Sequence, residues 1–214
     1  MRTNNRGLAA IGVTVAAAML VGTLSAQAAT TFTVRAGHAK PGTQVAFTAK
    51  AKSVTLSDSN SGFTITCTGA TSPGSTRTGK HGGSGIARLA ADKATFQNCS
   101  AFSGLLTGTV KGVGRWLVNA KSVKKGVVTG SVARIHFNVS TSLGCSFTLK
   151  GRAPAHYVDG KRSLQVLGGK SQLTVSNASQ HCQAAVSNGD KAYMQGKFAV
   201  HATKKRFNPI TIRS

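Results

Sequence analysis

The stretch LVNAKSVKKGVVTGSVARIHFNV, from Leu117 to Val139, indicates the fold class through the alternation of its side chains. Apolar and polar residues alternate along both halves, and Lys121, Lys124 and Lys125 interrupt the pattern near its middle. A period of two is typical of a β-strand with one buried face. The stretch therefore predicts two adjacent strands joined by a hairpin whose tip contains SVKKG.

The same period runs through the rest of the chain. In the second half of the opening stretch, one predicted face is apolar and the other largely polar: the first holds Ala133, Ile135, Phe137 and Val139, and the second Val132, Arg134, His136 and Asn138. FTITCTG, CSFTLK and KAYMQGKFAVH alternate in the same way, as do TFTVRA, TQVAFTAK, RWLVNAK, SLQVLG, SQLTVS and FNPITIR. Ten or more short strands separated by Gly and Pro turns predict an all-β fold, an antiparallel β-sandwich or a sandwich-like barrel.

Two segments depart from the strand pattern. Thr68–Gly85 is rich in Gly, Ser and Thr, and we predict a long mobile loop there. Gln180–Asn188 is compatible with one short turn of helix. Trp116, in GRWLV, is expected in the core.

The first 28 residues have the layout of a secretory signal peptide. Arg2 and Arg6 precede an uncharged run over 8–24, and the AQA triplet at 26–28 supplies the small residues of a cleavage site. The alternative is a retained membrane anchor, although a run of 17 residues rich in Ala, Gly and Thr is at the lower limit for spanning a bilayer. We therefore predict a secreted, extracellular protein whose single domain covers 29–214 and contains no membrane span.

Four cysteines in an exported chain imply two disulfides, for which three pairings exist. Cys67 and Cys99 enclose an interval of 32 positions, and Cys145 and Cys182 one of 37. Each interval opens with a cysteine in a strand-like run and closes on a polar cysteine segment, QNCS or QHCQ. This internal symmetry favours Cys67–Cys99 and Cys145–Cys182.

The order of features after Gly144 resembles a known family. GCSFTLKG, HYVDGKRSLQV, SQLTVSN and HCQAAVSNGDKAYMQGKFAV follow one another as in uncharacterised exported proteins of Streptomyces and related actinobacteria. The matching positions are Cys145, Tyr157, Cys182 and the turn at 188–190. The resemblance implies a β-rich domain with two disulfides over most of the mature chain, and it implies no activity. Members of that family are often near neutral, so the charge of this chain is a departure.

The charge of the mature part is its most unusual property. Without Arg2 and Arg6, 25 Lys and Arg remain against four aspartates and no glutamate, a net charge of +21. Such a protein is attracted to nucleic acid, anionic lipid and acidic cell-wall polymers; the alternative is that the charge only keeps it soluble. The cations form short clusters, which predicts weak, non-specific binding of polyanions. The residues expected to contribute are Lys121, Lys124, Lys125, Lys204, Lys205 and Arg206.

For Lys124 and Lys125, the solvated end of a hairpin is favoured over a dedicated ligand site. Both precede Gly126, where a turn places them in solvent, and lysines there also discourage edge-to-edge pairing of strands.

The sequence contains no recognisable catalytic or metal-binding motif. Most of the aspartates lie in turn sequences, and the six histidines lack metal-ligand spacing. HGGSG at 81–85 resembles an esterase oxyanion loop, but no serine in the chain has the flanking glycines of a nucleophile elbow, so a flexible loop is favoured. We predict a non-enzymatic protein without cofactor or metal. The alternative is a secreted hydrolase whose Ser, His and Asp meet only in the fold, which Asp92 or Asp159 beside a histidine and a serine would indicate.

Overall fold

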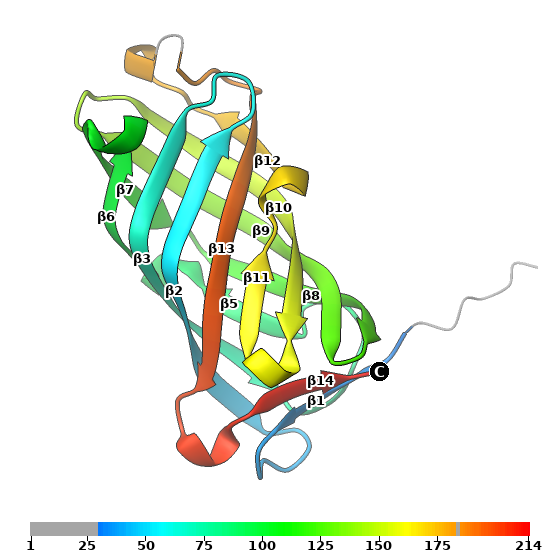
Figure 1. The fold of residues 1–214 in the computed structure, drawn as a ribbon. Helices are drawn as coiled ribbons and strands as arrows, with labels where there is room; N and C mark the ends of the chain where they lie inside the picture. Colours follow the sequence, from blue (N-terminus) through cyan, green and yellow to red (C-terminus); the bar gives the residue numbers. More distant parts are fainter. Residues whose placement is uncertain (1–29, 183–184) are drawn as a thin grey trace, which may run out of the picture.

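The computed structural model describes residues 30–182 and 185–214 of the chain (Figure 1). The predicted signal peptide, residues 1–28, lies outside this part. The described strands are β1 (Phe32–Ala36), β2 (Gln44–Asp58), β3 (Thr64–Arg77), β4 (Gly79–His81), β5 (Ala87–Ala90), β6 (Thr95–Ala101), β7 (Leu106–Gly112), β8 (Arg115–Lys124), β9 (Val127–Thr141), β10 (Ser146–Val158), β11 (Ser163–Val166), β12 (Gln172–Ser176), β13 (Lys191–Ala202) and β14 (Ile210–Arg213). Short 3₁₀ helices separate some of them: η1 (Ala91–Lys93), η2 (Phe102–Gly104), η3 (Asp159–Lys161), η4 (Gly168–Lys170), η5 (Gln180–Cys182) and η6 (Lys205–Phe207).

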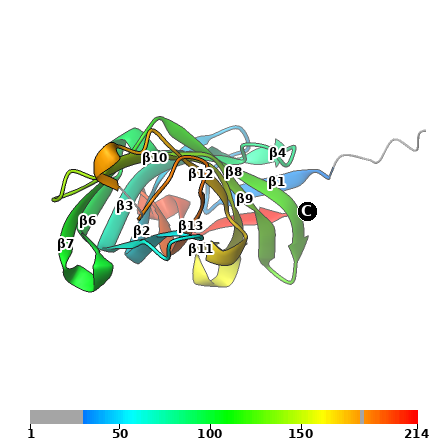
Figure 2. The same ribbon diagram turned by 90° about the horizontal axis from the view of Figure 1, so that it is seen from above.

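Eleven of these strands form one antiparallel sheet that closes on itself. β9, β10, β13, β2 and β3 are long, and each of the three remaining positions is shared by two shorter strands. At one end the ring runs β9-β10-β12-β13-β2-β3-β6-β7, and at the other end β9-β10-β11-β13-β2-β3-β5-β8. Seen from above, the strands surround a flattened interior (Figure 2). The all-β prediction is confirmed, in the form of a sandwich-like barrel.

A second, three-stranded sheet of order β14-β1-β4 covers one end of this barrel. Two buried side chains of the barrel hold it there. The Tyr157 hydroxyl donates to the Ile210 carbonyl oxygen (2.7 Å), and the Asp159 carboxylate accepts from the Ile212 N–H (3.2 Å). We call this the capped end. The other end carries the loops 59–63, 142–145, 177–182 and 185–190, together with η2, and we call it the disulfide end.

The inner faces of the strands make one hydrophobic core that also includes the cap. Trp116 is buried, as predicted, and its ring lies 4.8 Å from that of Phe137, edge to face. Phe63 and Phe147 make a similar contact at 5.9 Å nearer the disulfide end. Removing side chains of this size from water stabilises the fold by roughly 1.5–3 kcal/mol each.

The two predicted disulfides are both present. Cys67 and Cys99 are directly opposite each other on β3 and β6, with their Cα atoms 3.9 Å apart. Cys145, just before β10, is joined to Cys182 at the end of η5. Both bonds therefore lie in the half of the barrel next to the disulfide end. No helix within the described residues has the length and apolar character needed to cross a membrane.

The prediction of a mobile loop over Thr68–Gly85 is wrong. This segment holds most of β3, which pairs with β2 along its length and with β6 and β5 on its other side. Its threonines are good strand formers. Pro73, which suggested a turn, lies between the last β6 pair at Thr71 and the first β5 pair at Gly74, where its missing N–H is tolerated.

The predicted faces of β9 are correct from Arg134 onward and wrong before it. Val132 is buried and Ala133 is half-buried, the reverse of the expectation. Arg134 adopts a positive φ of 57°, and the register with β10 shifts between Gly151 and Ala153. One extra residue in a strand reverses the faces on one side of it, because the side-chain period is two.

Candidate anion-binding surface

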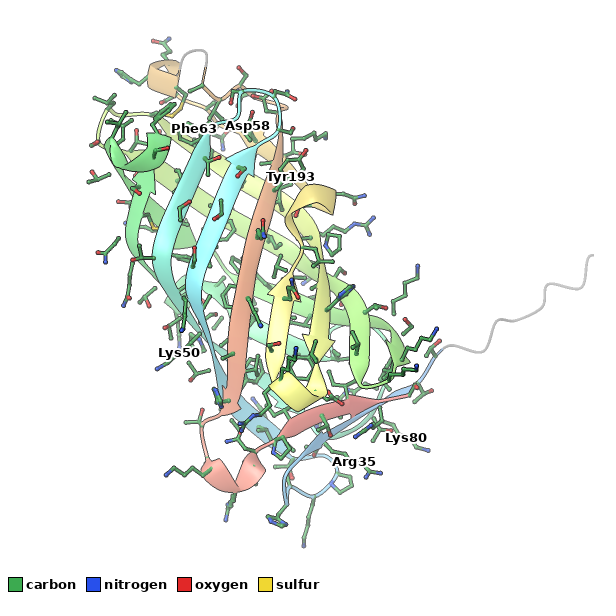
Figure 3. All side chains as sticks on the ribbon, viewed as in Figure 1. Arg35, Lys50, Asp58, Phe63, Lys80 and Tyr193 are labelled. Atoms are coloured by element: carbon green, nitrogen blue, oxygen red, sulfur yellow. A yellow bond between two sulfur atoms is a disulfide. The ribbon has the colours of Figure 1, made fainter. Side chains whose placement is uncertain are left out.

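About half of the Lys and Arg residues that the structure describes gather at the capped end. They come from the cap sheet, from the end of β3, from the loops and 3₁₀ helices beside it and from the β8–β9 hairpin: Arg35, Lys40, Arg77, Lys80, Lys121, Lys124, Lys125, Lys161, Arg162, Lys204, Lys205, Arg206 and Arg213, all of them exposed. Figure 3 shows Arg35 and Lys80 at this end and Asp58 and Phe63 at the opposite end. Among the described aspartate side chains, the one at the capped end, that of Asp159, is buried. The capped end is therefore strongly positive.

The hairpin lysines are placed as the solvated-hairpin interpretation predicts. β8 ends at Lys124 and β9 begins at Val127, so that Lys125 and Gly126 form a two-residue turn. Both turn residues have positive φ, 48° and 74°, as the tight turn that matches strand twist requires. Lys121, Lys124 and Lys125 are all exposed.

The second predicted cluster, Lys204, Lys205 and Arg206, lies at η6, on the far side of the cap. Arg206 lies over the ring of Phe207, 5.0 Å from its centroid. The two clusters are joined by β14, whose far end contacts the hairpin through η3. β14 runs from Ile210 to Arg213 between them, and at about 3.3 Å per residue this strand alone separates the clusters by roughly 10 Å. Because the Debye length is about 8 Å at physiological salt, the clusters act as separate sites.

The cationic side chains bond to neutral oxygens. Arg77 Nε donates to the Gly42 carbonyl (2.9 Å), Arg152 Nε to the Gln172 side-chain oxygen (2.5 Å) and Lys191 Nζ to the Thr174 hydroxyl (3.3 Å). A guanidinium held by a carbonyl or an amide keeps its full charge. The basic surface therefore remains available to an external anion.

The structure also brings together five arginines that are far apart in the sequence. Arg77, Arg88, Arg115, Arg134 and Arg152 are exposed on β3, β5, β8, β9 and β10, which are successive neighbours around the wall of the barrel. We call this group the arginine belt. Sequence reasoning missed it because each arginine occupies an ordinary outer-face position of its own strand. Only the register between strands shows that they share one band.

Burial and local charge shift the pKa values of three groups. Burial raises the pKa of the Asp159 carboxyl, against the opposing effects of the Ile212 N–H and of Arg213. Burial and the nearby Asp159 raise the pKa of Tyr157. On the outer wall, partial burial and the positive charge of Lys150 lower the pKa of His136.

The hydrolase alternative requires an aspartate bonded to a histidine, and the described residues show no such bond. Asp58 accepts from Asn60 and Ser61, Asp190 from Asn60 and Ser187, and Asp159 from Ile212. Asp92 is exposed in η1. Across 30–182 and 185–214, no three His, Cys, Asp or Glu side chains form a group that could hold a metal.

HGGSG is anchored, contrary to the flexible loop that was predicted. The Gly85 N–H donates to the Asn119 side-chain oxygen and the Ala120 N–H to the Gly83 carbonyl, both at 2.7 Å. A Cβ at Gly83 would lie 2.4 Å from the Ala120 carbonyl oxygen, so that only glycine permits this close approach to β8.

Comparison with models of protein families, with curated proteins and with solved structures gives no match for the chain. The resemblance to exported actinobacterial proteins therefore stays a prediction, and the function has to be inferred from the surface just described.

Proposed function

We propose that this chain is a non-enzymatic secreted protein that binds anionic polymers, either of the cell envelope or extracellular nucleic acid, through its basic surface. The observation that supports this most directly is the capped end. Its exposed Lys and Arg side chains are accompanied by the Asp159 carboxylate, which is 7% exposed and bonded to the cap. A surface of one sign raises the local concentration of counterions and speeds the association of an opposite charge.

Binding of this kind arises from counterion release. Each phosphate neutralised by a lysine or arginine releases condensed counterions, so that affinity falls with salt by a slope of about 0.7 to 0.9 per contact. Sequence-tolerant binding of nucleic acid usually adds stacking aromatics. Among the described Phe, Tyr and Trp rings, the one in the exposed class is that of Phe102, at the disulfide end. Affinity should therefore follow charge and not base identity.

Titration of the mature protein against single-stranded DNA, heparin and teichoic acid at several salt concentrations tests this proposal. We expect weak binding to all three that falls steeply with salt. Salt-insensitive binding to one polymer alone, or no binding at low salt, would contradict it.

Two variants locate the contribution of the capped end. K204Q/K205Q/R206Q should lower the salt slope by about 2 to 3, the contribution of three phosphate contacts. K50Q/K52Q/K197Q is the matched control, because it removes the same charge from the wall formed by β2 and β13. K124Q/K125Q should weaken binding modestly, since two cations of 25 are removed. Complete loss of binding in K124Q/K125Q would show that the hairpin is a dedicated site.

A further inference from the structure

The arginine belt is defined by the register of five neighbouring strands. Arg88 pairs with Ser75 on β3 and with Leu117 on β8. Arg77 follows Ser75 by two residues on β3, and Arg115 precedes Leu117 by two residues on β8. Both are diagonal neighbours of Arg88 on the outer face, where such pairs lie about 7–8 Å apart.

The bulge in β9 extends the belt to β10. β9 pairs with β10 through Ile135 opposite Gly151 and Val132 opposite Ala153, so that Arg152 faces the two residues between them, Ala133 and Arg134. The positive φ of Arg134, 57°, is sparsely populated by residues other than glycine and costs free energy. The bulge places the exposed Arg134 directly beside the exposed Arg152.

This arrangement places like charges together. Like charges directly opposite one another on neighbouring strands destabilise a sheet; Arg134 and Arg152 are placed in this way, and Arg77 and Arg115 are diagonal neighbours of Arg88. Exposed Lys150 adds a further positive charge two residues before Arg152 on β10. One carboxylate lies near the belt, that of Asp92, whose N–H donates to the carbonyl of Gly114, next to Arg115 (3.1 Å). A bound polyanion would relieve this repulsion.

One end of the belt lies in a surface pocket of about 350 Å³. Arg77 and Arg88 line it together with four polar side chains, those of Gln44, Ser75, Thr76 and His81. Arg77 uses its Nε for the Gly42 carbonyl, which fixes the plane of its guanidinium and leaves its terminal nitrogens for a ligand. A guanidinium fork binds two oxygens of one phosphate at once.

We propose that the arginine belt binds the backbone of a linear phosphodiester polymer, with phosphate groups on the guanidinium groups of successive strands and one end of the polymer in the Arg77–Arg88 pocket. The inference rests on the proposed polyanion binding and assigns it a surface and a ligand chemistry. The outer-face neighbours paired with Arg88 and Arg152 are Ser75, Leu117 and Gln172. The ring that lines the pocket, that of His81, is bonded to the Arg77 carbonyl oxygen, and no described Phe, Tyr or Trp lines it, so the belt recognises mainly the phosphate backbone.

Replacing arginines of the belt by lysine distinguishes binding by guanidinium groups from binding by positive charge alone. R88K/R134K/R152K keeps every charge but removes three guanidinium forks. We expect its affinity for single-stranded DNA to fall about tenfold, equivalent to the loss of roughly one net charged hydrogen bond, with its salt slope unchanged. K50R/K52R/K197R is the control, because it exchanges ammonium and guanidinium groups at constant charge on the wall formed by β2 and β13, outside both the belt and the capped end, and its affinity should stay within twofold of wild type.

The ligands in the experiment are single-stranded DNA, poly(glycerol phosphate) and poly-glutamate, with binding to labelled DNA followed by anisotropy and the others used as competitors. Poly(glycerol phosphate) has the phosphodiester backbone without bases, and should compete as well as DNA per phosphate. Circular dichroism and thermal melts confirm that both triple variants fold, which exchanges between arginine and lysine at exposed positions should allow.

The outcomes distinguish the two proposals. If the wild type binds no polymer at low salt, both fail. If it binds but the two triple variants behave alike, the belt is wrong and diffuse polyanion binding stands. If poly-glutamate competes as well as the phosphodiesters, or if poly(glycerol phosphate) does not compete, the assigned ligand chemistry is wrong.

Discussion

The two ends of the barrel are stabilised by different means. The disulfide end is held by Cys67–Cys99 and Cys145–Cys182, and the three large apolar side chains in the exposed class, Phe102, Leu105 and Leu143, belong to its loops. Asp58 and Asp190 lie there too, bonded to the loops 59–63 and 185–190. The capped end has neither disulfide. It carries about half of the cations, and β1 and β14 close it by pairing the two ends of the described chain.

This contrast indicates a division of tasks within one core. Like charges repel and destabilise a compact state, so the capped end needs buried interactions that outweigh the repulsion between its surface cations. The buried bonds from Tyr157 and Asp159 to β14 provide them. The disulfide end carries little charge and has long loops, which covalent links restrict.

Removing a disulfide should produce the largest effect. C67A/C99A opens a loop that closes over 32 positions, which in the chain-entropy account costs roughly 3.7 kcal/mol of the free energy of unfolding. Hydrogen exchange should rise first in β6, β7 and the loops of the disulfide end, while amides of β14 keep their protection. C145A/C182A is the parallel variant at the same end. Equal loss of protection at both ends would contradict the proposed independence of the two ends.

Loss of the cap bond should cost less and act at the opposite end. Tyr157→Phe leaves the ring in the core but removes the donor to Ile210, which should lower the free energy of unfolding by about 1 kcal/mol. Exchange of the β14 amides should rise while the disulfide end is unchanged. Tyr193→Phe, at a half-buried ring on β13, is the control and should have little effect. Unchanged β14 protection in Tyr157→Phe would show that this hydroxyl does not hold the cap.

The sequence predicts those features of the two ends that depend on residues close together in the chain. Alternation within one strand identifies FTITCTG and CSFTLK as strands, and the matched cysteine intervals give the correct disulfides. The hairpin at Lys125-Gly126 is local as well, since its turn chemistry is contained in the residues themselves. These features concern residues that are close in sequence or that repeat.

Features that depend on register were missed. Pairing of β1 with β14 joins positions almost the length of the described chain apart, and nothing in TFTVRA or PITIR selects the other. The bulge at Arg134 exchanged the predicted faces of Val132 and Ala133, because a pattern of period two cannot show where one extra residue is inserted. The arginine belt and the basic capped end follow from closure of the barrel, so spread charge was the most that the sequence indicated.

The pH dependence of stability should show the charge environment of the cap. The folded state raises the pKa of Asp159 above its unfolded value of about 3.9, so it holds the proton more tightly than the unfolded chain does. Protonated Asp159 therefore adds to the free energy of unfolding. This addition is fully present below about pH 3.9 and is lost as the pH rises through the pKa of the folded state. Urea unfolding of Asp159→Asn across that window should lack this decrease, whereas Asp190→Asn at the disulfide end should retain it. A profile for Asp159→Asn that matches the wild type would mean that the carboxyl is solvated.

The smallest effect is expected at the apolar loops of the disulfide end. Leu105 is 84% exposed and Leu143 66% exposed, so that changing them to serine removes almost no buried surface. L105S/L143S should therefore alter the free energy of unfolding by no more than about 0.5 kcal/mol. Leu149→Ala, in the core at 1% exposure, is the contrast and should cost about 2–5 kcal/mol. Urea unfolding of both variants provides the measurement. A loss above 1 kcal/mol in L105S/L143S would mean that these loops pack on each other in solution. The disulfide end would then be held by a hydrophobic contact as well as by its covalent links, and the contrast between the ends would be one of charge alone.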